Sequence, residues 1–384
     1  MTAPYDGIDF HKPTRTSKDA EYMLQALNAN RVSGGGPFTG RAEKLLKAII
    51  GAQRVLLATS CTHALEMAAL LYDIKPGDEV ILPSFTFTST ANAFVLRGAK
   101  IVFADSRPDT LNMDERGLEA LITKRTRAIV PVHYAGIACE MDTINAIAKS
   151  AGAEVLEDNA HGLFGFYKGK PLGSLGGMAT QSFHESKNIT CGEGGALVFN
   201  DARYLARAEI LREKGTNRSA FFRGEVDKYT WVDMGSSYVI SDVLAAYLTA
   251  QLEEASVAQA HRRKAFEAYI AELAPVAAKH GVKLPTVPAE CTPAYHLFYM
   301  LMPTAEHRDA LIKYLREQKI WSVFHYVPLH SAPEGVKVGG KLGDCPVVED
   351  IANRLIRLPF HSTFAEADQA RVIECVTEYC ATKV

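Results

Sequence analysis

The sequence predicts an α/β protein in which a large, mostly parallel sheet carries helices on both faces and a smaller α+β part follows. The first observation is that short β-branched segments alternate with amphipathic segments of helical length between residues 54 and 200. The second is that turn residues such as Pro76-Gly77-Asp78 and Ala151-Gly152 separate these segments. The third is that the alternation stops after Trp231. We therefore expect two domains, a large one over residues 1–250 and a small one over residues 251–384.

The expected elements follow in chain order. Short apolar runs predict strands at 54–59, 79–83, 100–104, 127–132, 154–157, 179–183 and 196–200. Apolar residues at helical spacing predict helices between them at 62–72, 89–97 and 141–150. In the second part we expect helices at 241–255, 259–274, 306–318 and 365–380, and strands near 296–302 and 321–325.

Composition and charge exclude several classes of protein. The chain has 384 residues, of which 47% are hydrophobic, and its 42 Lys and Arg against 44 Asp and Glu give a net charge of −2. These values are typical of a globular protein and leave no basic excess for nucleic acid or an anionic membrane. No apolar run reaches the length of about 18 residues that a membrane helix needs, and residues 1–20 lack the apolar core of a secretory signal. The seven cysteines form no C-x-x-C pair, so we expect no metal site and reduced thiols in a cytoplasmic protein.

Polar and aromatic residues follow several predicted strands, and the carboxyl ends of parallel strands meet at one edge of a sheet, where ligands bind. Residues 59–62 (Thr-Ser-Cys-Thr) open a helix and can present N–H groups to an anion. Phe87 can stack on a flat ligand, Asp158 can pair with a protonated ring nitrogen, and Lys187 can form a Schiff base. The ordinary alternatives are an N-cap, a packed ring, a capping carboxylate and a surface lysine. Taken together in this order, the four features predict the cofactor pyridoxal 5′-phosphate (PLP).

Longer strings of sequence resemble the DegT-type sugar-nucleotide aminotransferases. These strings are Gly36-Pro37 and residues 131–136, 157–161, 182–195 and 327–330. The likeness covers nearly the whole chain. It implies a PLP-dependent aminotransferase of fold type I, with L-glutamate and a nucleotide-linked keto-deoxy sugar as substrates. It also implies a homodimer whose active sites are shared between the subunits.

The resemblance assigns roles to individual residues. Lys187 would hold PLP covalently and act as general base and acid, and Asp158 would keep the pyridine nitrogen protonated. Phe87 would stack on the ring, and His161 would lie near the 3′ oxygen. The phosphate would be held by Cys61, Thr62 and Ser182.

The chain departs from the family's pattern at two places. Relatives send an Asn from the partner subunit to the phosphate in a Gly-x-Asn-x-Arg motif, and the matching residues here are 235–239 (Gly-Ser-Ser-Tyr-Val). Ser237 replaces that Asn, so we expect a phosphate contact of shorter reach. Asn159 stands where Ala is common.

The acceptor is suggested by residues 83–98, 213–218, 221–224 and 227–231, which look most similar to family members that aminate C4 of a dTDP-linked 4-keto-6-deoxyhexose. A diphosphate needs cations, and a sugar needs polar contacts. The candidate substrate-binding residues are Arg218, Arg223, Lys228, His325, Tyr326 and His330. A solvated charged loop and a packed turn are equally good explanations of these two groups. The galacto product is favoured, and a gluco product or a 3-keto acceptor stays open.

Three rival functions fit the sequence less well. A dehydratase of the same family would carry His in place of Lys187. A nicotinamide-dependent oxidoreductase would carry G-x-G-x-x-G after its first strand, where this chain has residues 59–63 (Thr-Ser-Cys-Thr-His). A non-catalytic PLP-binding regulator has no need to keep Lys187, Asp158 and Ser182 together.

Overall fold

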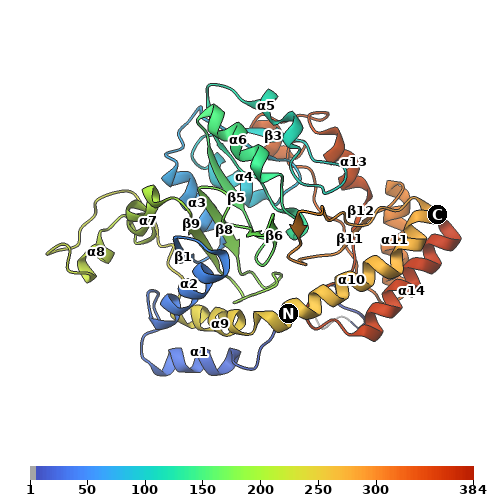
Figure 1. Cartoon of the computed structure of the whole chain (residues 1–384), viewed down its shortest axis with the longest axis horizontal. Coiled ribbons are helices and arrows are strands. Elements are labelled where there is room, and N and C mark those ends of the chain that lie inside the picture. The colour runs from blue at the N-terminus through green and yellow to red at the C-terminus, as the bar shows by residue number, and fades with distance from the viewer. Residues whose placement is uncertain (1–5) are drawn as a thin grey trace.

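The computed structural model describes residues 6–384, so the first five residues of the N-terminal stretch considered above lie outside the described part. Its centre is a seven-stranded sheet in the order β1-β9-β8-β5-β4-β2-β3 (Figure 1). The strands are β1 (Arg54–Ala58), β2 (Glu79–Pro83), β3 (Lys100–Ala104), β4 (Thr126–Ile129), β5 (Glu154–Asp158), β8 (Met178–Ser182) and β9 (Gly195–Phe199). β9 is antiparallel to β1 and β8, and the other neighbours are parallel. The predicted sheet and its seven strands are confirmed.

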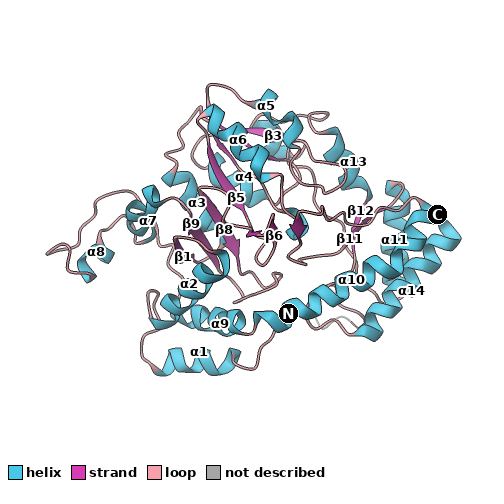
Figure 2. Ribbon diagram, in the orientation of Figure 1, coloured by secondary structure: helices cyan, strands magenta, loops and turns pink. Residues whose placement is uncertain are grey.

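Helices cover both faces of this sheet and make the expected three layers (Figure 2). The side chains of β1 alternate between the faces, as they must in a strand. Leu56 and Ala58 join the apolar core under α3 (Cys61–Leu71), α4 (Thr88–Val95) and α7 (Leu205–Arg212). Val55 and Leu57 join the core under α2 (Pro37–Ile50) and α9 (Asp242–Glu253). On this second face, α6 (Met141–Ala151) covers β4 and β5, and α1 (Asp19–Asn28) packs on the outside of α9.

Local sequence signals position the helices around the sheet edge. Ser60 Oγ accepts a hydrogen bond of 3.0 Å from the His63 N–H and thereby begins α3. Ser241 caps α9 in the same way. α2 begins with Pro37 and ends at Gly51, whose φ of 74° is the left-handed conformation that closes a helix.

The C-terminal part is organised along α10 (Ala255–His280), which runs toward the right of Figure 1. An antiparallel pair, β11 (Tyr299–Leu301) and β12 (Leu355–Arg357), shares an apolar cluster with α10, α11 (Ala305–Glu317) and α14 (Glu366–Lys383). α12 (Pro333–Lys337) and α13 (Pro346–Arg354) complete this part, and α13 packs against the core of the large sheet. The division of the chain near residue 250 remains a prediction.

The strand predicted at 321–325 is wrong. Val323 makes a single bridge with Arg357, and no regular strand forms there. The partner of β11 is β12, which is three residues long and is too short to stand out as a periodic pattern. The aromatic and imidazole side chains of His325 and Tyr326 line a cavity instead of packing on a sheet.

The remaining elements are short. β6 (Phe166–Tyr167), β7 (Lys170–Pro171) and β10 (Cys291–Thr292) form a small sheet, and α5 (Leu118–Leu121) lies beside α6. Residues 213–237, here called the arm, are closed at their base by a bridge between Glu213 and Ser237. The arm carries α8 (Arg218–Phe222) and extends away from the body of the molecule (Figure 1).

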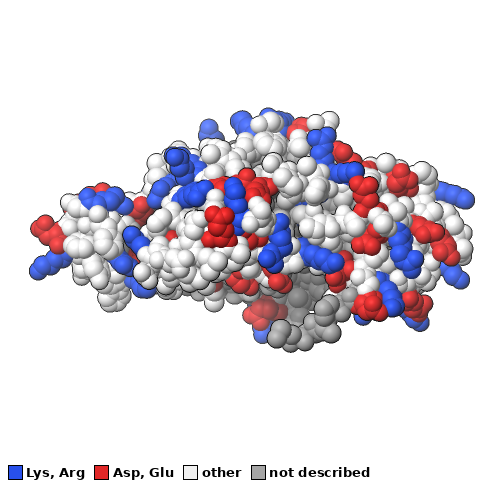
Figure 3. All heavy atoms as spheres, turned by 90° about the horizontal axis from the view of Figure 1, so that it is seen from below, with Lys and Arg blue, Asp and Glu red and all other residues white. Residues whose placement is uncertain are grey.

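The distribution of charged side chains agrees with the small net charge of the chain. Lys and Arg are mixed with Asp and Glu over the face drawn in Figure 3. Within residues 6–384, every helix is too short or too polar to cross a membrane.

Candidate active site

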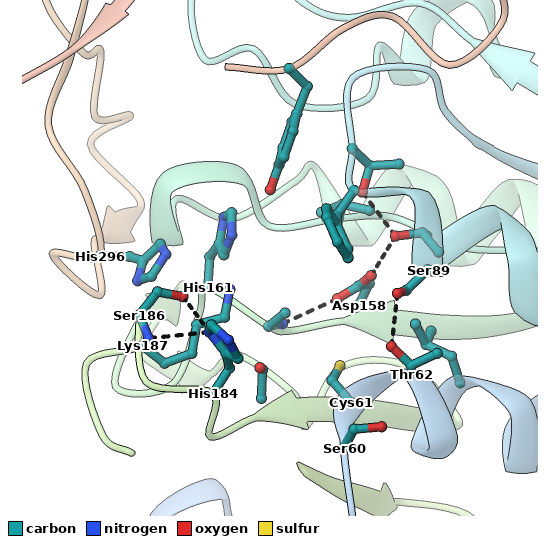
Figure 4. A pocket seen from close by; sticks show the side chains of 18 of the residues that line it. Ser60, Cys61, Thr62, Ser89, Asp158, His161, His184, Ser186, Lys187 and His296 are labelled. Carbon is teal, nitrogen blue, oxygen red and sulfur yellow. Dashed lines mark hydrogen bonds between the residues drawn. The ribbon is translucent and has the colours of Figure 1, made fainter. Parts of the chain in front are cut away.

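A cavity of about 690 Å³ lies where the parallel strands end. Its wall takes residues from the segments that follow β1, β2, β4, β5 and β8, as the predicted sheet requires. The C-terminal part adds His296, His325, Tyr326 and Arg357, and the N-terminal segment adds Phe10 and His11. The cavity therefore joins residues that are far apart in the sequence (Figure 4).

Lys187 lies in the turn after β8, where its N–H donates to the His184 carbonyl at 2.9 Å, and its side chain lines the cavity. Burial lowers the pKa of the Lys187 amine to about 8, and the positive charge of Arg357 acts in the same direction. With this pKa, roughly a tenth of the amine is neutral at pH 7. A neutral amine is the form that attacks a carbonyl carbon and that takes up a proton.

Asp158 is the last residue of β5 and is only 4% exposed. Burial raises the pKa of its carboxyl, while hydrogen bonds from the Thr90 hydroxyl (2.8 Å) and the Ala160 N–H (3.2 Å) favour the ionised form. Thr90 in turn meets Thr86 Oγ1 at 2.9 Å, so the carboxylate is held in one orientation. Among residues 6–384 this carboxylate has no ion-pair partner, and a ring N–H⁺ from a ligand would supply one.

The start of α3 forms the third feature of the site. Ser60, Cys61 and Thr62 line the cavity at the positive end of the helix dipole. Thr62 Oγ1 lies 2.7 Å from Ser89 Oγ in the first turn of α4, and Ser182 ends β8 nearby. Burial raises the pKa of the Cys61 thiol to about 12, so it stays protonated. Ser60, Cys61, Thr62 and Ser182, here called the cradle, offer backbone and hydroxyl donors that can hold an anion.

The chain can approach this cradle closely only because residue 195 is glycine. A Cβ atom at Gly195 would lie 2.2 Å from the carbonyl carbon of Ser60 and 2.3 Å from the Cys61 nitrogen. β9 is therefore packed directly under the beginning of α3, and a side chain there would displace the cradle.

Rings form the remaining walls. Phe87 is 59% exposed and faces the cavity from the start of α4, with Tyr326 at 6.5 Å between ring centres. His161 stacks on His296 at 4.2 Å. Burial pushes the pKa of His161 well below its usual range, so the ring is neutral, and its Nδ1 has no hydrogen-bond partner within the described chain. His325 Nδ1 meets the Tyr134 hydroxyl at 3.0 Å.

The structure brings nine of the candidate residues from the sequence to this one cavity. They are Cys61, Thr62, Phe87, Asp158, His161, Ser182, Lys187, His325 and Tyr326. Their individual roles toward a ligand remain predictions.

Five other candidates lie outside the cavity of this chain. Ser237, Arg218, Arg223 and Lys228 are exposed on the arm. His330 is fully buried, with Nδ1 at 2.6 Å from Ser84 Oγ and Nε2 at 2.8 Å from Glu349 Oε1.

Sequence reasoning missed several residues of the cavity wall. Ser89 and Thr90 could have been found from their place in the first turn of the helix after Phe87. His296 and Arg357 carry no local signal, because only the folding of the C-terminal part over the sheet edge brings them to the site.

The fold and this site together define a PLP-dependent aminotransferase of fold type I. The chain belongs to the DegT/DnrJ/EryC1/StrS aminotransferase family, whose model matches residues 13–377. It is 33% identical over 378 residues to GDP-perosamine synthase of Caulobacter vibrioides, with 97% of this chain and 98% of that protein covered.

Solved structures share this fold. The aminotransferase TlmJ from Streptoalloteichus hindustanus superimposes with a TM-score of 0.91 at 28% identity, covering 98% of this chain and 100% of that one. The PLP form of the putative sugar aminotransferase Spr1654 from Streptococcus pneumoniae gives a TM-score of 0.89 at 24% identity, covering 98% and 100%.

The residues present fit the cofactor. A lysine of lowered pKa, a buried carboxylate without a cationic partner, an exposed ring and an anion cradle match the aldehyde, ring nitrogen, ring face and phosphate of PLP. PLP is therefore the cofactor, and the chain is a PLP-dependent sugar aminotransferase.

Proposed function

We propose that this enzyme transfers the amino group of L-glutamate to C4 of a dTDP-linked 4-keto-6-deoxyhexose. The products would be 2-oxoglutarate and a dTDP-4-amino-4,6-dideoxyhexose of galacto configuration. The observation that carries the transfer is the single cavity that holds Lys187, Asp158 and the cradle at the start of α3. The acceptor rests on the likeness of residues 83–98, 213–218, 221–224 and 227–231 to dTDP-4-amino-4,6-dideoxygalactose transaminase. The name of the Caulobacter relative, GDP-perosamine synthase, also supports an amino sugar as product.

Each residue of the site has a defined task in this proposal. When bound, PLP supplies the carbon that receives the amino group and the ring that takes up electrons. The neutral Lys187 amine takes the proton from Cα of glutamate and returns a proton to the cofactor side. In the second half of the reaction it moves a proton to C4 of the sugar. Asp158, oriented by Thr90, keeps the proton on the pyridine nitrogen.

The remaining cavity residues hold the ligands. The cradle of Cys61, Thr62 and Ser182 would take the phosphate, and Phe87 would lie against the ring face. His325 and Tyr326 line the wall that the C-terminal part provides, and we assign them to the sugar. His330 does not line the cavity, and it would act on the sugar only by holding its loop in place through Ser84 and Glu349.

The arm supports the homodimer in this proposal. Its Arg218, Arg223 and Lys228 are exposed, as are Phe222 (69%) and Trp231 (79%). Large exposed aromatic side chains on a protruding segment are typical of a surface that is covered by a partner. We propose that the arm reaches the partner's cavity, with its cations at the sugar-nucleotide diphosphate and Ser237 at the cofactor phosphate. The enzyme would act in the cytoplasm, and all seven cysteines are free thiols.

The test is an absorbance titration of the purified protein. L-Glutamate should remove the yellow band of bound cofactor, and the dTDP-4-keto-6-deoxyhexose should restore it. The Lys187→Ala variant should fail at both steps, whereas Lys264→Ala, which removes a surface lysine paired with Glu366, should behave as the parent protein. NMR of the product would then give the configuration at C4.

Different results of this titration would reject different parts of the proposed function. A band that glutamate removes but this sugar does not restore would reject the acceptor and favour another nucleotide keto sugar, such as a 3-keto isomer. A band that no amino acid changes would reject the aminotransferase and favour a regulatory protein.

A further inference from the structure

Arg357 places a guanidinium group in the cavity wall from the end of β12. Its backbone is fixed on both sides. It pairs with Tyr299 of β11 on one side, and on the other its N–H donates to the Val323 carbonyl at 2.7 Å. The side chain therefore starts from a rigid position, which favours a site built for a ligand.

The charge of Arg357 lacks a counter-charge. Its Nε is buried and has no hydrogen-bond partner within residues 6–384, and no carboxylate of that range lies in ion-pair distance. The guanidinium carbon lies 4.7 Å from the ring centre of Phe10, which supplies an apolar face. A cation left like this in a cavity wall is costly, because it has lost water without gaining an anion.

Arg262 is also buried, but its guanidinium has hydrogen-bond acceptors within the protein. Its guanidinium donates to the carbonyls of Tyr295 (2.9 Å) and His296 (2.6 Å) and to Ser362 Oγ (3.3 Å). Arg262 is thus satisfied by the protein itself, whereas the donors of Arg357 are available to a ligand.

The position of Arg357 separates it from the phosphate cradle. Ser60, Cys61 and Thr62 lie at the start of α3, across the cavity from His161 and His296 (Figure 4). Arg357 pairs with Tyr299, whose ring lies 5.9 Å from that of Tyr134. Tyr134 in turn lies 5.9 Å from His161 and 5.7 Å from His325 between ring centres, so Arg357 is on the side of the cavity that holds these imidazoles. After burial, its charge is among the causes that lower the pKa of Lys187. A ligand anion there would be next to the amine that exchanges protons with the substrate.

We propose that Arg357 binds a carboxylate of the amino-acid donor and thereby selects amino acids over simple amines. The inference rests on the proposed function, because it concerns the donor of the same reaction. The carboxylate of an amino acid is one bond from the Cα whose proton Lys187 removes, so it must lie close to Lys187. The diphosphate of a sugar nucleotide is on the opposite side of the sugar ring from C4 and cannot come as near. A guanidinium matches a carboxylate with two parallel hydrogen bonds.

The test uses two reagents that react with bound PLP without transamination. Aminooxyacetate carries a carboxylate, and methoxyamine does not. The rate at which each removes the absorbance band is measured for the parent protein, Arg357→Gln, Arg357→Lys and Arg263→Gln. The last variant is the matched control, because Arg263 is an exposed residue that pairs with Glu267 on the surface of α10.

Arg357→Gln should slow aminooxyacetate by about 10- to 100-fold, as expected for a charge-assisted pair, and change methoxyamine by less than about twofold. Arg357→Lys should recover part of the rate, and Arg263→Gln should change neither. Binding of glutarate, measured by calorimetry on protein without cofactor, should weaken by a similar factor in Arg357→Gln.

Two results would overturn the inference. An unchanged ratio of the two reagents in Arg357→Gln would show that no carboxylate is bound there, even if glutamate transamination proceeds normally. An equal loss with both reagents and unchanged glutarate binding would mean that Arg357 acts on the cofactor or on the fold. If the ratio falls as expected but glutamate leaves the band intact, the carboxylate site stands and the proposed donor is wrong.

Discussion

The lowered pKa of Lys187 predicts how the protein takes up its cofactor as a function of pH. Only the neutral amine reacts with the aldehyde of PLP. With the pKa at about 8 instead of the usual 10.5, the neutral fraction at pH 7 rises by a factor of about 300, since 2.5 pKa units separate the two values. The cause is burial in the cavity wall, helped by the charge of Arg357.

The assay is the initial rate of formation of the yellow band when PLP is mixed with cofactor-free protein between pH 6 and pH 10. The rate should increase with pH, because the pKa of an amine marks the loss of its proton. It should be half-maximal near pH 8 and level off above about pH 9. The same reaction with Nα-acetyl-lysine, expressed per neutral amine, gives the contribution of PLP's own ionisation, which is divided out. A corrected rate that keeps rising to pH 10, as for the free amine, would refute the account of a desolvated lysine.

Three further predictions follow from the site. Asp158→Asn should keep the cofactor but slow its reaction with glutamate by about 10²- to 10³-fold, as measured by stopped-flow absorbance. A rate near that of the parent protein would contradict the role of Asp158 in keeping the pyridine nitrogen protonated. Thr90→Val should remove the hydrogen bond to Asp158 and slow the reaction with glutamate by about tenfold. The pH profile of this rate should also shift, because the pKa of Asp158 rises further without the hydrogen bond. An unchanged profile would mean that Thr90 does not position the carboxylate. Gly195→Ala should weaken PLP binding by at least about tenfold, since its Cβ would lie 2.2 Å from the backbone of Ser60. The control Gly177→Ala, whose Cβ would lie 3.8 Å from the nearest atom, should bind PLP normally. Equal dissociation constants for the two variants would contradict the packing of β9 under the cradle.

The large sheet could be predicted because each of its strands is an apolar run set off from the next by turn residues. Once the strands were known to be parallel, the ends of β1, β5 and β8 had to share one edge, and this brought Thr62, Asp158 and Lys187 together. The prediction thus followed from the topology of the sheet.

The residues from the C-terminal part could not be predicted in the same way. Arg357 ends a strand of three residues and reaches the cavity only because β12 pairs with β11 beside the large sheet. His330 stands in a motif that suggested a substrate contact, yet its ring is fully buried between Ser84 and Glu349. Such placements depend on packing between distant segments, which leaves no periodic trace in the sequence.

The central claim is that Lys187 carries the cofactor. It is tested most directly by reducing the yellow protein with borohydride, digesting it and identifying the modified peptide by mass spectrometry. The account predicts one phosphopyridoxyl group per chain, on Lys187. A label on another lysine, or a Lys187→Ala variant that is labelled as fully as the parent protein, would contradict it.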